Sequence, residues 1–147
     1  MNRQIFVNLP VRDLERSKAF FSALGFVNNP QFTNADAACM VVSDTIYLML
    51  LTEPFFQGFT PKAISDASNS TEVLLCLSCD SRAAVDDMAD KARSAGGRWP
   101  NPPKDHGFMY QHGFEDLDGH MWELVYMESM PEQAPEDAAA ADADLAI

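Results

Sequence analysis

The amino-acid sequence predicts an α+β fold built from two similar halves, each with one strand, one helix and three further strands. The chain has 147 residues, which is the usual size of one domain. Alternating apolar residues, typical of strands, precede and follow two helical patterns. Val11 and Cys79 are the last apolar residues before the two helix starts, and the same order of elements follows each of them.

The first half begins with alternating apolar residues that predict a strand over residues 5–11. Asp13 is a favourable N-cap for the helix that follows, and Gly25 can end that helix in a left-handed conformation. Three β-rich runs come next: from Phe26 onward, over 37–42 and over 46–51. A connector over 52–70 then carries three Phe residues, which we expect to cover other apolar surface because exposed aromatic side chains are costly.

The second half repeats this order. A strand is predicted over residues 73–79, and Asp80-Ser81 can cap a helix that Gly96-Gly97 ends. Further strands are predicted from Arg98 onward, over 108–114 and over 121–127. Asp118-Gly119 is a strong signal for a two-residue hairpin turn between the last two strands.

The segment over residues 128–147 differs from the rest in composition. It is rich in Ala and Pro and carries six acidic residues with no Lys or Arg. Such a segment buries too little apolar surface to offset the entropy lost on ordering, so we expect it to be disordered. A short Ala-rich helix is the alternative.

The charge of the chain restricts its partners. The formal net charge is −12 and the sequence pI is near 4.4, which argues against nucleic acid and anionic membranes and permits a cationic ligand. No apolar run approaches the length of a transmembrane helix or a secretory leader, so a cytoplasmic location is expected.

Three cysteines, Cys39, Cys76 and Cys79, lie in apolar runs, as expected of reduced thiols in a reducing compartment. Cys76 and Cys79 have the spacing of some zinc and redox sites. On a strand, however, residues three apart point to opposite faces, so one metal ion could not hold both. We interpret the pair as structural.

Two stretches resemble a known family. Asn8-Leu9-Pro10-Val11-Arg12-Asp13-Leu14-Glu15-Arg16-Ser17-Lys18-Ala19-Phe20-Phe21, followed by Leu24-Gly25-Phe26, is similar to the first-module signature of the vicinal-oxygen-chelate superfamily. Asp116-Leu117-Asp118-Gly119-His120-Met121-Trp122-Glu123-Leu124 is similar to its closing hairpin. The family comprises glyoxalase I, extradiol dioxygenases, fosfomycin- and bleomycin-resistance proteins and methylmalonyl-CoA epimerase.

The resemblance implies two tandem βαβββ modules whose sheets curl into a cup-like half-barrel. We expect a glyoxalase-like domain over residues 1–127, with module one over about 3–51, the connector over 52–70 and module two over 71–127. The resemblance also implies a divalent metal held inside the cup by one residue from each of four strands.

The positions that match those metal ligands carry few donors. They fall on Phe6, on Leu74, on Tyr47 or Met49, and on Glu123, and only the last is a metal-binding side chain. The sequence therefore predicts no cofactor at this place, and these residues are expected to line a ligand cup instead. A register shifted by two residues would bring Asn8 or Glu72 into the set. A divalent metal held by Glu123 with His112 or Glu72 is the alternative.

Glu123 is the leading site residue, because a carboxylate between apolar neighbours is expensive unless it is paired or functional. We predict that it lines the cup as an acid or base; a structural ion-pair role is the alternative. Phe108, Tyr110 and His112 share one strand face and are predicted to contact the ligand, although His112 can also be a structural histidine. His106 is predicted in a loop and His120 on the surface.

These features favour a homodimeric protein that binds a small organic molecule in an aromatic-lined cup, with a cation favoured over an anion. One alternative is a metal-dependent lyase or dioxygenase with shifted ligands. Another is a non-catalytic dimeric scaffold or regulatory partner that uses the acidic tail as its contact element. Metal analysis separates the first two, and a ligand-stabilisation screen separates the first from the third.

Overall fold

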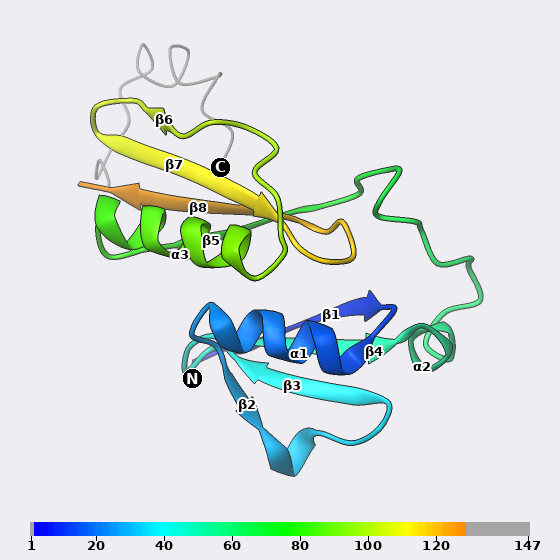
Figure 1. Ribbon diagram of the computed structural model, residues 1–147. Coiled ribbons are helices and arrows are strands. Elements are labelled where there is room, and N and C mark those ends of the chain that lie inside the picture. The colour runs from blue at the N-terminus through cyan, green and yellow to red at the C-terminus, as the bar shows by residue number, and fades with distance from the viewer. Residues whose placement is uncertain (1, 129–147) are drawn as a thin grey trace.

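Module one contains a mixed four-stranded sheet. A computed structural model describes residues 2–128 of the chain (Figure 1). Its first module comprises β1 (Ile5–Val11), α1 (Leu14–Ala23), β2 (Val27–Asn29), the 3-10 helix η1 (Pro30–Phe32), β3 (Ala37–Val41) and β4 (Ile46–Thr52). The strand order is β1-β4-β3-β2, in which β1 and β4 are parallel and the other pairs are antiparallel.

Module two has the same arrangement. It comprises β5 (Leu74–Ser78), α3 (Arg82–Ser94), β6 (Lys104–Asp105), β7 (Met109–Glu115) and β8 (Met121–Met127), in the order β5-β8-β7-β6. β5 and β8 are parallel, and the other pairs are antiparallel. The predicted α+β fold with two tandem βαβββ modules is therefore confirmed, and among the described residues the sheets stay open rather than closing into a barrel.

Local sequence signals account for the element boundaries. The Asp13 carboxylate accepts a hydrogen bond from the Arg16 N–H at 3.1 Å, and the Ser81 hydroxyl oxygen accepts one from the Ala84 N–H at 3.0 Å. Gly25 ends the first helix at a φ of 103°. The strand predicted from Arg98 onward was wrong in extent, because only an isolated bridge from Arg98 to Glu115 precedes the short β6.

The connector begins with a short helix, α2 (Glu53–Gln57), and then runs around the outside of the molecule to β5 (Figure 1). Phe55 and Phe59 contact each other edge to face, with ring centroids 5.3 Å apart. Phe59 is nevertheless 71% exposed, so the expectation that these rings cover other apolar surface is wrong for Phe59.

The two helices α1 and α3 lie between the two sheets, so each sheet has an inner face toward the helices and an outer face away from them (Figure 1). One core joins the modules. The ring centroids of Phe21 and Trp122 are 5.5 Å apart, and those of Phe20 and Phe114 are 6.0 Å apart. Burying these rings drives the association of the modules, because each fully buried large apolar side chain contributes roughly 1.5–3 kcal/mol.

The turn between β7 and β8 fastens module two to the start of α1. Asp118 is buried, and its carboxylate accepts hydrogen bonds from the Arg12 N–H at 2.9 Å and from the Ser17 hydroxyl at 3.1 Å. Asp116 is buried beside it and accepts from the indole N–H of Trp122 at 3.0 Å. The acidic turn residues therefore have a structural role, because they satisfy donors at the module junction.

The segment predicted to be a disordered tail lies outside the described residues, except for Glu128. Within residues 2–128, no helix has the length and apolar character needed to cross a membrane.

Candidate functional site

The outer face of module two presents Glu123 to solvent at the centre of β8. Glu123 lies opposite Cys76 in the parallel pair β5–β8 and opposite Gly113 in the antiparallel pair β7–β8. Trp122 and Leu124, its chain neighbours, point to the inner face and are buried in the core. The alternation of the strand therefore places a half-buried carboxylate on a surface whose other side is the core.

Gly113 and Gln111, on the neighbouring strand β7, define the space that the Glu123 carboxylate occupies. A Cβ atom added at Gly113 would lie 3.3 Å from Oε2 of Glu123 and only 2.5 Å from the Trp122 carbonyl oxygen, so only glycine fits here without a shift of the neighbouring strand. The side-chain amide of Gln111 donates a hydrogen bond to Oε2 of Glu123 at 3.4 Å. Gly113 and Gln111 thus set where the carboxylate lies.

Cys76 adds a thiol to the same surface. The residue is exposed, yet its sulfur is partly desolvated, and this desolvation raises the pKa of the thiol. The negative charge of Glu123 raises that pKa further, with a smaller contribution from Cys79. At neutral pH Cys76 is therefore a protonated thiol that can donate a hydrogen bond. Cys79 packs against the core, which agrees with the prediction that the two cysteines point to opposite faces.

The outer face of module one carries four of the predicted ligand-binding residues. Phe6 pairs with Tyr47 across β1 and β4, and Asn8 pairs with Met49. The rings of Phe6 and Tyr47 are stacked, with centroids 4.7 Å apart, and Phe6 is 52% exposed. This face therefore supplies an aromatic wall, flanked by an amide and a thioether.

His112 and Tyr110 lie on the inner face of module two, away from Glu123. His112 pairs with Leu124, is 4% exposed and contacts the Trp99 ring at a centroid distance of 4.7 Å. Burial lowers the pKa of His112, and its Nδ1 accepts a hydrogen bond from the Gly113 N–H at 2.9 Å, which also favours the neutral ring. The expectation that His112 and Glu123 share one surface is therefore wrong.

Tyr110 belongs to the same inner-face row. Its hydroxyl donates to a carboxylate oxygen of Asp86 on α3 at 2.6 Å. That hydrogen bond, followed by desolvation, raises the pKa of Tyr110 to about 12. Phe108 stands just before β7 and is 39% exposed. The sequence grouped Tyr110 and His112 correctly on one face but assigned that face to the ligand, because both faces of β8 are apolar and Phe114 can face either a core or a cup.

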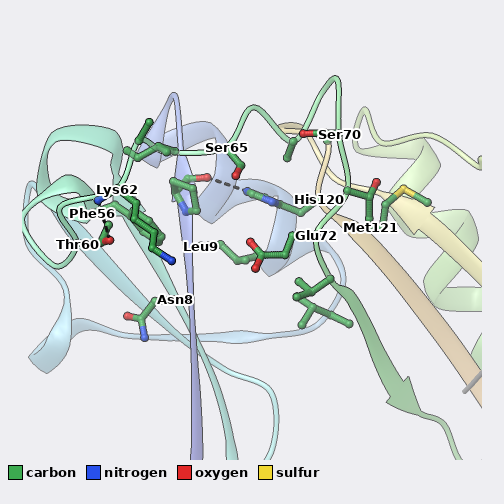
Figure 2. A pocket seen from close by; sticks show the side chains of 18 residues that line it. Asn8, Leu9, Phe56, Thr60, Lys62, Ser65, Ser70, Glu72, His120 and Met121 are labelled. Atoms are coloured by element: carbon green, nitrogen blue, oxygen red, sulfur yellow. Dashed lines mark hydrogen bonds between the residues drawn. The ribbon is translucent and has the colours of Figure 1, made fainter.

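A second candidate site is a pocket between β1, the connector and the start of β8, which we call the connector pocket (Figure 2). Its volume is about 450 Å³. Two predicted residues, Asn8 and Glu72, line it, together with Lys62, which sequence reasoning did not single out. The other lining residues include Leu9, Pro10, Phe56, Thr60, Ile64, Ser65, Ser70, Val73, His120 and Met121.

His120 lines this pocket and is held there by a hydrogen bond. The prediction that His120 lies free on the surface was therefore wrong. Its Nε2 lies 2.8 Å from the carbonyl oxygen of Pro10, and because a carbonyl only accepts, Nε2 donates (Figure 2). His106, predicted in a loop, lies just after β6, with its Nε2 3.3 Å from the side-chain oxygen of Gln111. Among residues 2–128, no group of three or more His, Cys, Asp or Glu side chains is arranged to hold a metal ion.

Comparisons with known proteins support the same fold. The model of the bleomycin resistance protein-like N-terminal family matches residues 3–43. No curated protein sequence matches the chain. A hypothetical protein from S. aureus is similar in structure, with 28% sequence identity and a TM-score of 0.72, over 86% of this chain and 95% of that chain.

Two further solved structures illustrate the range of the fold. A glyoxalase-related enzyme from Fulvimarina pelagi has 20% identity and a TM-score of 0.75, covering 91% of this chain and 94% of that chain. The fosfomycin resistance protein FosX from Mesorhizobium loti has 17% identity and a TM-score of 0.64, covering 86% and 92%. The predicted resemblance to the vicinal-oxygen-chelate superfamily is confirmed by the family match and by these structures.

Proposed function

We propose that this chain, which has the fold of the glyoxalase/bleomycin-resistance/dioxygenase proteins, binds a small organic ligand on the outer faces of its sheets, with Glu123 as the polar anchor. The observation that supports the proposal is the half-buried Glu123 carboxylate on the outer face of module two. It lies next to Gly113 on β7 and to Cys76 on β5. A carboxylate held there can accept a hydrogen bond from a ligand, pair with a cation or exchange a proton.

The aromatic part of the site comes from module one. The stacked Phe6 and Tyr47 rings offer a flat apolar surface, and the neighbouring Asn8 can donate and accept hydrogen bonds. Module two thus carries an acid and a thiol on its outer face, and module one carries an amide and two aromatic rings on its own. Because the helices lie between the sheets, these two faces point away from each other within one chain, and a second copy of the chain is needed to bring them together. With a net charge of −12, the chain attracts a cationic ligand more strongly than an anionic one.

A homodimer would enclose this site. β1 and β5 are end strands of their sheets, and Ile5, Phe6, Val73 and Leu74 near their starts are each more than half exposed. Apolar side chains at open sheet edges favour association, and a second copy is the partner we propose for them. Light scattering should give the mass of a dimer, and Phe6→Ser with Leu74→Ser should shift it toward the monomer. A wild-type monomer would contradict this part of the proposal.

The metal that the family implies does not fit the residues found at its positions. Phe6 and Leu74 carry no donor atom, and the cross-strand neighbours of Glu123 are Cys76 and Gly113. Of the alternative ligands, His112 lies on the inner face, and Glu72 lines the connector pocket, to which Glu123 does not contribute. Ligand binding is therefore proposed through the side chains themselves. Stoichiometric metal in protein purified without added metal would favour the lyase or dioxygenase alternative instead.

The test is a screen for ligands that raise the melting temperature, followed by one substitution. The screen should include small organic cations together with fosfomycin and bleomycin, because similar structures are named for resistance to these compounds. Glu123→Gln keeps the shape and removes the charge, so affinity for a cationic ligand found in the screen should fall about tenfold or more. Glu15→Gln, on the exposed side of α1, is the matched control and should leave affinity unchanged. If Glu123→Gln bound the ligand as tightly as the unchanged protein, Glu123 would not be part of the binding site.

A further inference from the structure

We propose that the connector pocket is a second binding site, for a small zwitterion of the amino-acid or dipeptide type. Its volume of about 450 Å³ lies within the range of about 300–1,000 Å³ that is usual for small-molecule sites. Asn8 belongs to both sites, but Glu123, Cys76, Phe6 and Tyr47 do not line this pocket, so its charged groups differ from those of the site proposed on the outer faces.

Two opposite charges face this pocket from different walls. Lys62 extends into it from the connector, and Glu72 extends into it from the segment just before β5 (Figure 2). Neither side chain takes part in any of the ion pairs formed within residues 2–128. The Lys62 ammonium and the Glu72 carboxylate are thus available to a ligand that carries both complementary charges.

The two opposite charges at the pocket favour a ligand that is neutral overall. An anion attracted by Lys62 would meet a chain of net charge −12 and the nearby Glu72 carboxylate. A cation attracted by Glu72 would be repelled by Lys62. A zwitterion satisfies both groups, with its carboxylate toward Lys62 and its ammonium toward Glu72.

The rest of the pocket suits the apolar part of such a molecule. Leu9, Phe56, Ile64 and Val73 supply apolar walls. The Asn8 amide group donates to the Phe6 carbonyl oxygen at 3.2 Å, which holds Asn8 in place as a polar neighbour. An amino acid or dipeptide with aliphatic side chains therefore matches both the charged and the apolar lining.

The walls are held in place before any ligand arrives. The Asp66 carboxylate, in the connector, forms an ion pair at 3.2 Å with Arg12, which lies between β1 and α1. The connector also lies directly on the turn before β8, because a Cβ at Gly119 would be 2.7 Å from the Ala67 carbonyl oxygen. The His120–Pro10 hydrogen bond fixes another wall. Such pre-formed walls reduce the ordering cost of binding.

The experiment is calorimetric titration of the full chain with L-leucine and leucyl-leucine. The matched single-charge probes are isopentylamine, which lacks the carboxylate, and 4-methylpentanoate, which lacks the ammonium. At least one zwitterion should bind, and both single-charge probes should bind about tenfold more weakly or worse. Failure of both zwitterions to bind at millimolar concentration, or equal binding of the single-charge probes, would overturn the proposal.

Substitutions then test the two charges separately. Lys62→Gln and Glu72→Gln should each weaken zwitterion binding about tenfold, whereas the exposed control substitutions Lys104→Gln and Asp44→Asn should not. The double charge swap, Lys62→Glu with Glu72→Lys, should recover binding that either single reversal abolishes, because a zwitterion can bind with its ends exchanged. The assignment of Lys62 and Glu72 to the binding site would be contradicted if the control variants lost as much affinity as the Lys62 and Glu72 variants. It would also be contradicted if the double charge swap did not restore binding. Glu123→Gln should leave zwitterion binding unchanged, because Glu123 does not line this pocket. Failure of the outer-face proposal can therefore be distinguished from failure of this one.

Discussion

Gly113 lies opposite Glu123 in the register of β7 and β8, and its missing side chain leaves the Glu123 carboxylate its space on the outer face. A Cβ at this position would come within 2.5 Å of the Trp122 carbonyl oxygen, which is closer than atoms of neighbouring strands can approach. The glycine therefore links the local geometry of the sheet to the position of the candidate acid.

Gly113→Ala should destabilise the protein, because the obstacle is a backbone atom of the neighbouring strand that cannot move aside cheaply. The free energy of unfolding should fall by about 1–3 kcal/mol, as is usual for overpacking. Urea unfolding monitored by Trp fluorescence measures it. The control is Gly107→Ala, whose Cβ would meet no atom within 4 Å, although its positive φ adds some strain. A loss at Gly113 no larger than the loss at Gly107 would show that β7 and β8 can relax.

Cys76 should react slowly with alkylating reagents, because desolvation and the Glu123 carboxylate raise the pKa of its thiol. Removing the negative charge in Glu123→Gln should lower that pKa and increase the alkylation rate at pH 8 by a factor of about 2 to 10. Mass spectrometry after timed iodoacetamide treatment resolves Cys76 from the other two cysteines. Cys39, which is buried in β3, serves as the internal control and should keep its rate. An unchanged rate at Cys76 would mean that the two groups are not neighbours in solution.

Asp118→Ala should be among the more damaging substitutions at the module junction. It removes the acceptor for the Arg12 N–H and the Ser17 hydroxyl, and leaves both donors unsatisfied near the start of α1. Two hydrogen bonds to a buried carboxylate predict a loss of about 2–4 kcal/mol in the free energy of unfolding. Ser17→Ala removes only one of these bonds and should cost less. Asp44→Ala, on an exposed turn, should change stability by under about 0.5 kcal/mol.

His112 should make stability depend on pH. Burial lowers its pKa in the folded protein below the ordinary value of 6.5, so the unfolded chain binds the proton more tightly. The resulting contribution to stability is complete above pH 6.5 and is lost as the pH falls below 6.5 and through the lower folded pKa. His112→Gln should therefore flatten the fall in melting temperature between pH 6.5 and 5. Titration of the His112 ring protons by NMR measures the folded pKa directly, and a midpoint at or above 6.5 would contradict the prediction.

The sequence by itself determined the fold and most of its elements. Alternating apolar residues, the caps at Asp13 and Ser81 and the positive φ of Gly119 are local signals, and each acts through its own chain neighbours. The two-residue hairpin turn predicted at Asp118-Gly119 was wrong in length, because β7 ends at Glu115 and β8 begins only at Met121. The sequence also placed Phe6, Asn8, Tyr47 and Met49 on the same side of their strands, because the side-chain period of a strand is two residues.

Only the tertiary structure decided which side of each sheet is the core. β8 is apolar on both faces, so periodicity could not tell the side of Trp122 from the side of Glu123. The packing of α1 and α3 between the sheets buries Trp122 and His112 and leaves Glu123 outside. The connector pocket likewise depends on segments distant in sequence, since Lys62 and Glu72 face one cavity only because the connector folds against β1 and the start of β8. Such long-range contacts arise from burying both modules in one core, a cooperative effect that no local pattern encodes.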